Sequence, residues 1–105
     1  MNLKTQEYIC TLAECGSITE AAKRLYISQP ALSMYISNVE KSMGIQLFDR
    51  SGKNLKLTYT GELYVHKARQ MIELQDEFER EVNDIRAGIT GRIRIGLQRK
   101  RSTTL

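Results

Sequence analysis

A helix beginning at residue 17, with a second one close behind it, constrains the fold of this chain more than any other feature. Ser17, followed three residues later by Glu20, has the spacing of a capping box, in which each side chain bonds the backbone of the other residue. Apolar residues then follow at helical spacing. A short helix is therefore predicted over residues 18–25.

A tight turn at residues 26–27 separates this helix from the next one. Ser28 is a preferred N-cap residue, and Pro30 lies in the first helical turn, where its missing N–H would have no helical partner. The residues predicted to face the core are Ala31, Leu32, Ile36, Val39 and Met43. Gly44 is the expected end of this helix, which spans residues 29–43. A short helix, a tight turn and a longer helix predict a helix-turn-helix.

An earlier helix is predicted before residue 16. Its apolar positions have helical spacing and are Leu3, Tyr8, Ile9, Leu12 and Ala13. Gly16 follows them and can adopt the left-handed backbone conformation that ends many helices. The amino-terminal part of the chain is therefore expected to form three helices around one core.

The pattern changes after Gly44, where short alternating runs replace the helical spacing. Residues 46–50 and 55–58 alternate in polarity, and residues 51–54 between them have the composition of a turn. We interpret this segment as a hairpin, which forms a wing behind the helix-turn-helix. Three cations would gather on this small projection, namely Arg50, Lys53 and Lys56.

Thr58 is a suitable cap for a long helix over residues 59–87, with Gly88 as its expected end. Its apolar positions, with one polar member, recur at spacings of four and three, as in a coiled coil. They are Tyr64, Ala68, Met71, Gln75, Phe78, Val82 and Ile85. Leu63 and Leu74 fall off this seam. Such a helix extends about 43 Å, more than a domain of about 60 residues can cover, so a homodimer through this helix is expected.

The net charge of +4 is unevenly distributed along the chain. Residues 1–60 carry seven basic side chains against five acidic ones, and residues 61–91 carry four against seven. Residues 92–105 carry five basic side chains and no acidic one. Binding to nucleic acid therefore has to be argued from the local placement of cations rather than from net charge.

Other functional classes find little support in the sequence. Cys10 and Cys15 are five residues apart, on different faces of one helix, so free thiols are expected. With His66 as the only histidine, no cluster has the spacing of metal ligands or of a catalytic set. No enzyme activity, cofactor or metal is expected. No apolar run approaches the roughly 20 residues of a membrane helix, and no secretory signal begins the chain, so a cytoplasmic protein without membrane contact is expected.

Residues 16–61 resemble the N-terminal DNA-binding domain of LysR-type bacterial transcriptional regulators. The motifs that carry the likeness are Gly16-Ser17-x-Thr19-x-Ala21-Ala22, Leu25 before Ser28-Gln29-Pro30-Ala31-Leu32-Ser33, Glu40, Gly44 before Leu47-Phe48-x-Arg50, and Leu57-Thr58-x-x-Gly61. The resemblance implies a mainly α fold, with a winged helix-turn-helix of three helices and a two-stranded wing over residues 1–58. A dimerisation linker helix over residues 59–88 would follow. Residues 89–105 would be the start of an effector-binding domain, entered through a strand at residues 91–97, or a disordered tail.

The same resemblance implies that the third helix enters the major groove of DNA. The residues expected at base edges are Gln29, Pro30, Ser33 and Met34. The glutamine amide can pair with adenine, serine suits several bases, and the apolar side chains can contact a base or a thymine methyl group. The residues expected at phosphates are Ser17, Ser28, Tyr35, Ser37, Arg50, Lys53 and Lys56.

The third helix departs from many relatives, because Met34 stands where arginine is common and three neighbouring positions lack basic residues. Modest affinity per half-site is therefore expected, with more of the attraction coming from the wing. The sequence favours specific binding of double-stranded DNA as a dimer, for transcription regulation. Two alternatives stay open, a dimerisation or protein-interaction module and a fragment of a molybdate-responsive winged-helix regulator. A small-molecule effector is expected only for a full-length form.

Overall fold

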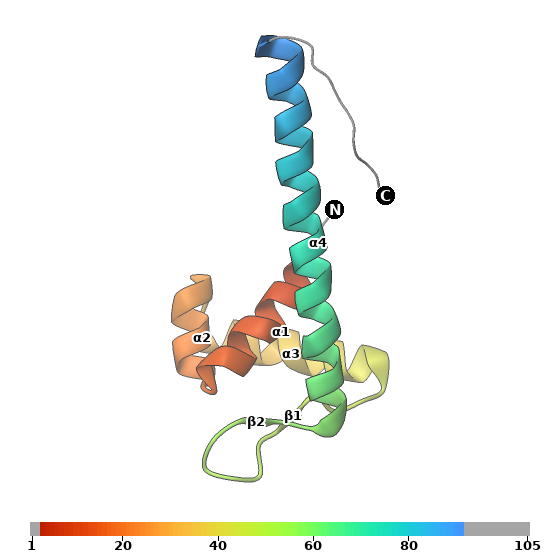
Figure 1. Ribbon diagram of the computed structural model, residues 1–105. Coiled ribbons are helices and arrows are strands. Elements are labelled where there is room, and N and C mark those ends of the chain that lie inside the picture. Colours follow the sequence, from red (N-terminus) through yellow and green to blue (C-terminus); the bar gives the residue numbers. More distant parts are fainter. Residues whose placement is uncertain (1–2, 92–105) are drawn as a thin grey trace. The chain divides into compact units, whose positions relative to one another are not determined.

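The elements of the fold follow one another as three helices, a hairpin and a long helix (Figure 1). The structure is a computed structural model, and it describes residues 3–91. The helices are α1 (Lys4–Cys15), α2 (Ile18–Leu25), α3 (Gln29–Met43) and α4 (Tyr59–Gly91), and the strands are β1 (Phe48–Asp49) and β2 (Lys56–Leu57). The predicted fold class, a winged helix-turn-helix followed by a long helix, is confirmed.

Serine caps begin α2 and α3 where the sequence predicts them. Ser17 Oγ accepts a hydrogen bond from the N–H of Glu20 at 3.3 Å, and Ser28 Oγ accepts one from the N–H of Ala31 at 3.2 Å. The carboxylate of Glu20 lies 3.7 Å from Lys23 Nζ instead of returning a bond to Ser17. Only one half of the predicted capping box therefore forms.

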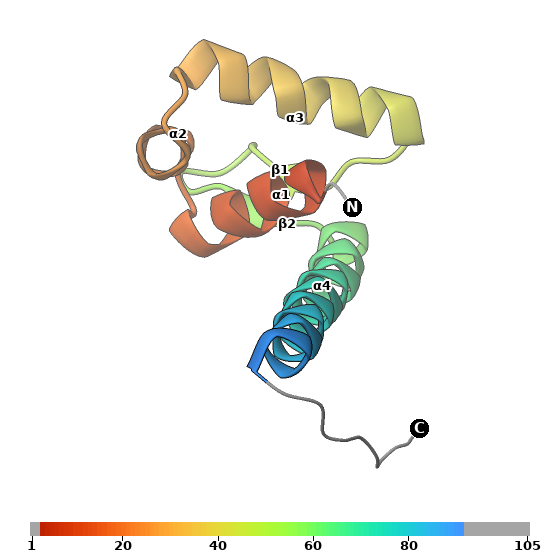
Figure 2. The same cartoon turned by 90° about the horizontal axis from the view of Figure 1, so that it is seen from above.

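The turn between α2 and α3 is tight because a residue other than glycine adopts the left-handed conformation. Tyr26 has a φ of 60°, and its N–H donates to the carbonyl of Lys23 at 3.2 Å. The N–H of Ile27 reaches back to the carbonyl of Ala22 at 3.0 Å, so α2 ends in a Schellman motif. Figure 2 shows α2 end-on, between the end of α1 and the beginning of α3.

The core lies where α1, α2, α3 and β1 meet the first part of α4. Its largest fully buried side chains are Ile9, Leu12, Leu32, Ile36, Leu47 and Phe48. The predicted inward stripe of α3 is wrong at Ala31, which is exposed, and at Met43, which is 44% exposed. The buried stripe is narrower than predicted, because Leu32 and Ile36 point at the core while Ala31 lies one residue off their line and Met43 belongs to the last turn.

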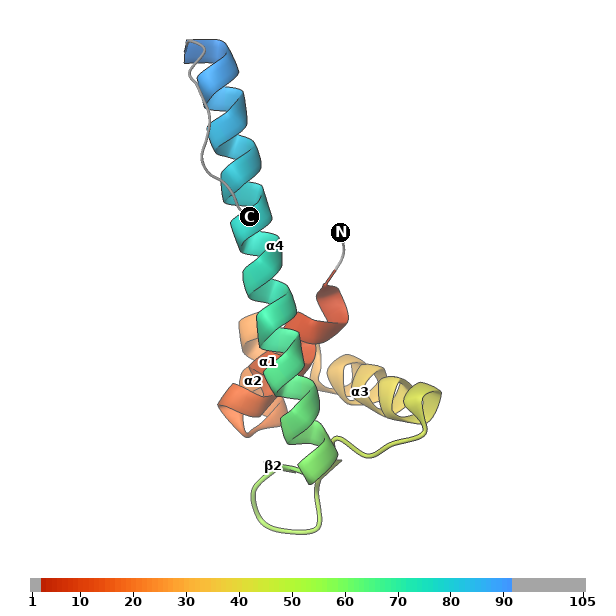
Figure 3. The same ribbon diagram turned by 45° about the vertical axis from the view of Figure 1, so that its right-hand side comes forward.

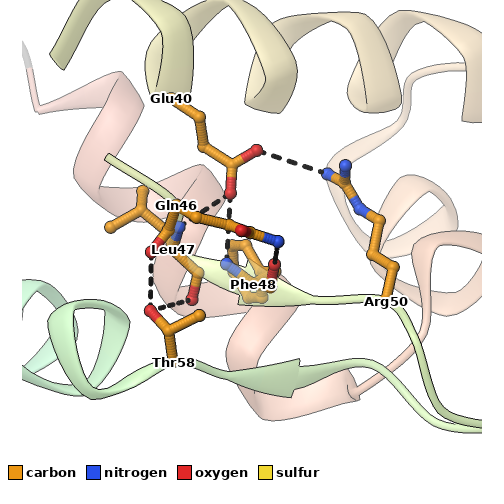
Figure 4. Close-up of polar contacts among 6 residues, drawn as sticks. All are labelled: Glu40, Gln46, Leu47, Phe48, Arg50 and Thr58. Atoms are coloured by element: carbon orange, nitrogen blue, oxygen red, sulfur yellow. Dashed lines mark hydrogen bonds and ion pairs between the residues drawn. The ribbon is translucent and has the colours of Figure 1, made fainter. Parts of the chain in front are cut away.

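The hairpin is antiparallel, with Phe48 opposite Leu57 and Asp49 opposite Lys56. Its loop extends away from the helices (Figure 3). Thr58 connects the hairpin to α4, because its hydroxyl donates to the carbonyl of Gln46 at 2.6 Å (Figure 4). The same hydroxyl accepts a hydrogen bond from the N–H of Gly61 at 2.9 Å. The predicted cap at Thr58 is confirmed.

The described residues form two compact units, one up to Glu73 and the other from Leu74 onward. The first contains α1, α2, α3, the hairpin and the first part of α4, and the second contains the rest of α4. The predicted end of this helix at Gly88 is wrong, because Gly88 stays helical and α4 continues to Gly91. A glycine inside a helix costs only about 1 kcal/mol relative to alanine, so it does not by itself end one. A strand was expected over residues 91–97. Gly91 is the last residue of α4, and residues 92–97 lie outside the described residues.

Candidate DNA-binding surface

The exposed side of α3 carries the residues that the sequence predicts at base edges. Gln29, Pro30, Ser33 and Met34 are all exposed. A shallow hollow on this side is lined by Pro30, Ser33, Met34, Ser37, Asn38 and Lys41. It brings together three of the predicted base-contacting residues and Ser37, which was predicted at phosphate.

Asn38 and Lys41 line the same hollow but were not among the predicted contact residues. Asn38 follows Met34 by four residues, and Lys41 follows Ser37 by four. Positions four residues apart lie on one helix face. This spacing was the signal that could have added both residues to the predicted surface.

Tyr35, which was predicted at phosphate, is engaged within the protein. Its hydroxyl forms a 2.6 Å hydrogen bond with Thr5 Oγ1, and its ring centroid lies 4.8 Å from that of Tyr8. The ammonium of Lys4 lies 5.4 Å from each of these two ring centroids. Tyr35 therefore joins α3 to α1, a contact between residues thirty positions apart that no local pattern indicates.

Each wing cation has a different electrostatic environment. The guanidinium of Arg50 lies 3.8 Å from Glu40, and Lys56 stands opposite Asp49 in the register of the hairpin. Bonds from the hydroxyl and the N–H of Ser51, with the nearby charge of Lys56, hold the pKa of Asp49 below its usual value, so this carboxylate stays charged. Lys53 forms no ion pair with any acidic side chain of residues 3–91.

These pairings reduce the charge that the wing presents. Three cations and two carboxylates gather at the hairpin and the end of α3, so their net charge is +1. The prediction that three cations lie close to the hairpin is consistent with this arrangement. The sequence did not indicate that two of them have acidic neighbours.

The residues predicted for the dimer seam have unequal access to solvent. Met71, Phe78 and Ile85 are exposed, whereas Gln75 and Val82 are half-buried. Ala68 is 1% exposed and packs in the core of its own unit. Tyr64 is half-buried, and burial raises the pKa of its hydroxyl. Leu63 and Leu74, which the sequence placed off the seam, are 53% and 64% exposed.

An apolar groove opens beside the first part of α4. It has a volume of about 280 Å³, and its lining residues are Gln6, Met43, Ile45, Thr60, Leu63, Tyr64, Lys67, Ala68 and Met71. Three of these were predicted in the dimer seam. The groove lies within the first compact unit, and its apolar lining is open to solvent.

Other kinds of site are not found among residues 3–91. No group of three or more His, Cys, Asp or Glu side chains in this range is placed to hold a metal ion. Both cysteines are free thiols, with Cys10 buried and Cys15 half-buried. None of the helices in this range combines the length and the apolar character needed to cross a membrane.

Comparison with known proteins identifies the family. The family described as "Bacterial regulatory helix-turn-helix protein, lysR family" matches residues 3–62. The chain belongs to the LysR family. Membership confirms that the chain comes from a family of transcriptional regulators rather than of enzymes.

Relatives of the LysR family match almost the whole chain. A "Probable RuBisCO transcriptional regulator" of Chlorokybus atmophyticus is 40% identical over 94 residues, which is 90% of this chain and 30% of that protein. An "Uncharacterized HTH-type transcriptional regulator YcgK" of Bacillus subtilis is 36% identical over 97 residues, which is 92% of this chain and 30% of that protein. The chain therefore spans about 30% of the length of these relatives.

Solved structures of LysR regulators share the fold. The DNA-binding domain of BenM, in complex with catB site 1 DNA, has a TM-score of 0.79 and 33% identity, and the match covers 84% of this chain and 98% of that domain. Full-length CbnR complexed with its target DNA has a TM-score of 0.68 and 32% identity, covering 84% of this chain and 30% of that chain. The chain therefore corresponds to the DNA-binding part of LysR regulators.

Proposed function

We propose that this chain binds double-stranded DNA in a sequence-specific manner, as a homodimer, and that it serves transcription regulation in the cytoplasm. The observation that carries the proposal is the exposed face of α3, the second helix of a helix-turn-helix, in a chain whose relatives include domains crystallised on DNA. The polar and apolar side chains on this face match the chemistry of base edges in the major groove.

Gln29 is proposed to read a base at the beginning of α3. It is exposed in the first turn, beside the Ser28 cap, and its amide can donate to and accept from adenine. Pro30 and Met34 offer apolar contact nearby, and Ser33 offers a hydroxyl. Phosphate contacts from the wing and from backbone N–H groups at the helix beginnings would fix the protein on the duplex without selecting sequence.

Selection of bound duplexes from a random pool, at near-physiological salt, tests this proposal. A dimer is expected to enrich two half-sites separated by about 34 Å, one turn of DNA. Gln29→Ala should weaken binding to the selected duplex by about 1–3 kcal/mol and leave binding to random duplexes unchanged. Gln70→Ala, an exposed glutamine on α4, is the matched control and should change neither. Equal losses on selected and random duplexes for Gln29→Ala would rule out base reading by this residue.

The homodimer is proposed to form along an exposed apolar stripe of α4. Its large apolar members are Leu63, Met71, Leu74, Phe78 and Ile85. Their spacings are those of one helical stripe, with Lys67 and Glu81 at the two remaining turns. Five exposed apolar side chains on one helix are a surface that a partner would cover. This stripe shares Met71, Phe78 and Ile85 with the predicted seam. It includes Leu63 and Leu74, and it leaves out Tyr64, Ala68, Gln75 and Val82.

The order of residues along the stripe favours an antiparallel pair of α4 helices. In a two-fold symmetric antiparallel pair centred on Leu74, Leu63 meets the partner's Ile85, Met71 meets the partner's Phe78, and Lys67 meets the partner's Glu81. In a parallel pair each residue meets its own copy, so Glu81 and Lys67 would each face a like charge. The antiparallel arrangement would also cover the apolar groove, which Leu63, Lys67 and Met71 line.

The mass of the protein in solution, measured by sedimentation, distinguishes the two interfaces. Leu74→Glu should dissociate the dimer, because it places two carboxylates on the symmetry axis. Gln75→Glu adds the same charge one residue away and should leave the protein dimeric. The reverse result would support the predicted seam instead. Lys67→Glu should weaken the dimer, and adding Glu81→Lys should restore it only if the helices are antiparallel.

A protein-interaction module is the second candidate, and the exposed stripe on α4 is the observation that favours it. The two functions differ in their dependence on DNA. If the protein is dimeric but the selection enriches no sequence and duplexes of all compositions bind alike, the chain acts by pairing and not by reading DNA. An effector ligand is proposed only for a longer form, because the relatives extend well beyond this chain.

A further inference from the structure

Glu40 joins α3 to the wing through one carboxylate. It lies near the end of α3, and its side chain is only 12% exposed. Its Oε2 atom accepts hydrogen bonds from the N–H of Leu47 at 2.7 Å and from the N–H of Phe48 at 3.1 Å (Figure 4). These two residues lead into β1, so Glu40 fixes the backbone where the hairpin begins.

The other oxygen of the same carboxylate faces a wing cation. Glu40 Oε1 lies 3.8 Å from the guanidinium of Arg50, which is itself about half-exposed (Figure 4). The two N–H bonds hold the carboxylate in place, so the negative charge beside Arg50 is fixed rather than carried on a freely rotating side chain. Arg50 therefore reaches solvent with part of its charge already offset.

We propose that Glu40 is a specificity-determining residue, which lowers the attraction of the wing for DNA of any sequence by restraining Arg50. The proposal rests on the proposed function, DNA binding through α3 and the wing. Attraction to phosphates strengthens binding to every duplex equally, whereas base contacts strengthen binding to selected duplexes only. A carboxylate that offsets one wing cation reduces the attraction to phosphates and leaves the base contacts unchanged. It therefore raises the ratio of specific to non-specific affinity.

Glu40→Gln separates the effect of the negative charge of this residue from the effect of its hydrogen bonds to the backbone. The glutamine carbonyl can still accept the N–H groups of Leu47 and Phe48, while the negative charge beside Arg50 is removed. Binding to a selected duplex and to random duplexes would be measured by fluorescence anisotropy over a range of salt concentrations. We expect random duplexes to bind about three- to tenfold more tightly, with a salt dependence steeper by about one counterion. The ratio of specific to random affinity should fall.

Two further variants identify Arg50 as the group that is released. The gain on random duplexes should disappear in the double variant Glu40→Gln, Arg50→Gln. Glu14→Gln is the matched control, because Glu14 pairs with Arg24 at 3.0 Å but both side chains are more than half-exposed and solvent already screens them. A gain in Glu14→Gln as large as in Glu40→Gln would mean that net charge alone is responsible, and the inference would be overturned.

Circular dichroism would establish whether Glu40→Gln is folded. A second comparison tests the inference without this variant. In the otherwise unchanged protein, Arg50→Gln should reduce affinity for random duplexes less than Lys53→Gln does, because Lys53 has no acidic partner among residues 3–91. An equal or larger loss at Arg50 contradicts the inference. If the unchanged protein retains no duplex at all, the proposed function fails instead, so the two failures are distinguishable.

Discussion

Gly61 is the position where a single added methyl group should unfold this domain most readily. A Cβ atom at Gly61 would lie 3.0 Å from the carbonyl carbon of Leu47, 3.0 Å from Leu57 Cδ2, and closer still to the carbonyl oxygen of Leu47. The Leu47 carbonyl cannot easily move away, because it accepts a hydrogen bond from the N–H of Thr58 at 2.9 Å. The N–H of Leu47 is in turn bonded to the carboxylate of Glu40. The helix must therefore move or the bond to Thr58 must break.

The magnitude follows from three contributions. Overpacking costs about 1–3 kcal/mol, and at a backbone atom we expect the upper part of this range. Loss of the Thr58 hydrogen bond adds about 1 kcal/mol, and the better helix propensity of alanine returns about 1 kcal/mol. Gly61→Ala should therefore lower the free energy of unfolding by about 2–3 kcal/mol, which corresponds to a fall in Tm of about 10–20 °C for a domain of this size.

The same substitution elsewhere in α4 is the control. A Cβ at Gly88 meets nothing within 4 Å, so Gly88→Ala should only favour the helix, by up to about 1 kcal/mol. Thermal and urea unfolding followed by circular dichroism would measure both variants. We expect a lower midpoint for Gly61→Ala and an equal or higher one for Gly88→Ala. If Gly61→Ala melts with the unchanged protein, α4 does not approach Leu47 this closely in solution.

Two further predictions concern α1 and its contact with α3. Tyr35→Phe removes the bond to Thr5 and should lower the free energy of unfolding by about 1 kcal/mol without changing DNA affinity. A loss of affinity with unchanged stability would show instead that Tyr35 contacts phosphate. At mildly alkaline pH, Cys15 should react with a thiol reagent before Cys10, because burial raises the pKa of the Cys10 thiol and less of it is ionised. Mass mapping of the labelled protein checks this order, and equal rates would contradict it.

Helix boundaries were predictable because the signals for them are local. The hydroxyls of Ser17 and Ser28 each accept a hydrogen bond from the N–H group three residues further along the chain. Gly16 and Gly44 adopt the left-handed conformation directly after α1 and α3. Such signals act over a few residues and do not depend on the rest of the fold. Gly88 shows the limit of a local signal, because glycine permits a helix to end without requiring it.

The composition of the α4 stripe was harder to predict. A spacing of three and four describes several overlapping stripes on one helix, and the sequence favoured the one through Ala68 and Gln75. The structure places Val65 and Ala68 in the core of their unit and leaves Leu63 and Leu74 exposed. Which stripe is exposed to solvent depends on the side of the helix that packs against the core. The periodicity of the helix does not indicate that side.

Sequence alone was enough to predict the order of the elements, most of their caps and the LysR motifs, since these depend on neighbours close in the chain. It also predicted most of the exposed face of α3. The pairing of charges and hydroxyls depends instead on the tertiary structure. Glu40 meets Leu47, Phe48 and Arg50, and Tyr35 meets Thr5, through contacts between different elements. Such contacts depend on how whole helices pack, because packing alone brings residues distant in the chain within hydrogen-bond distance.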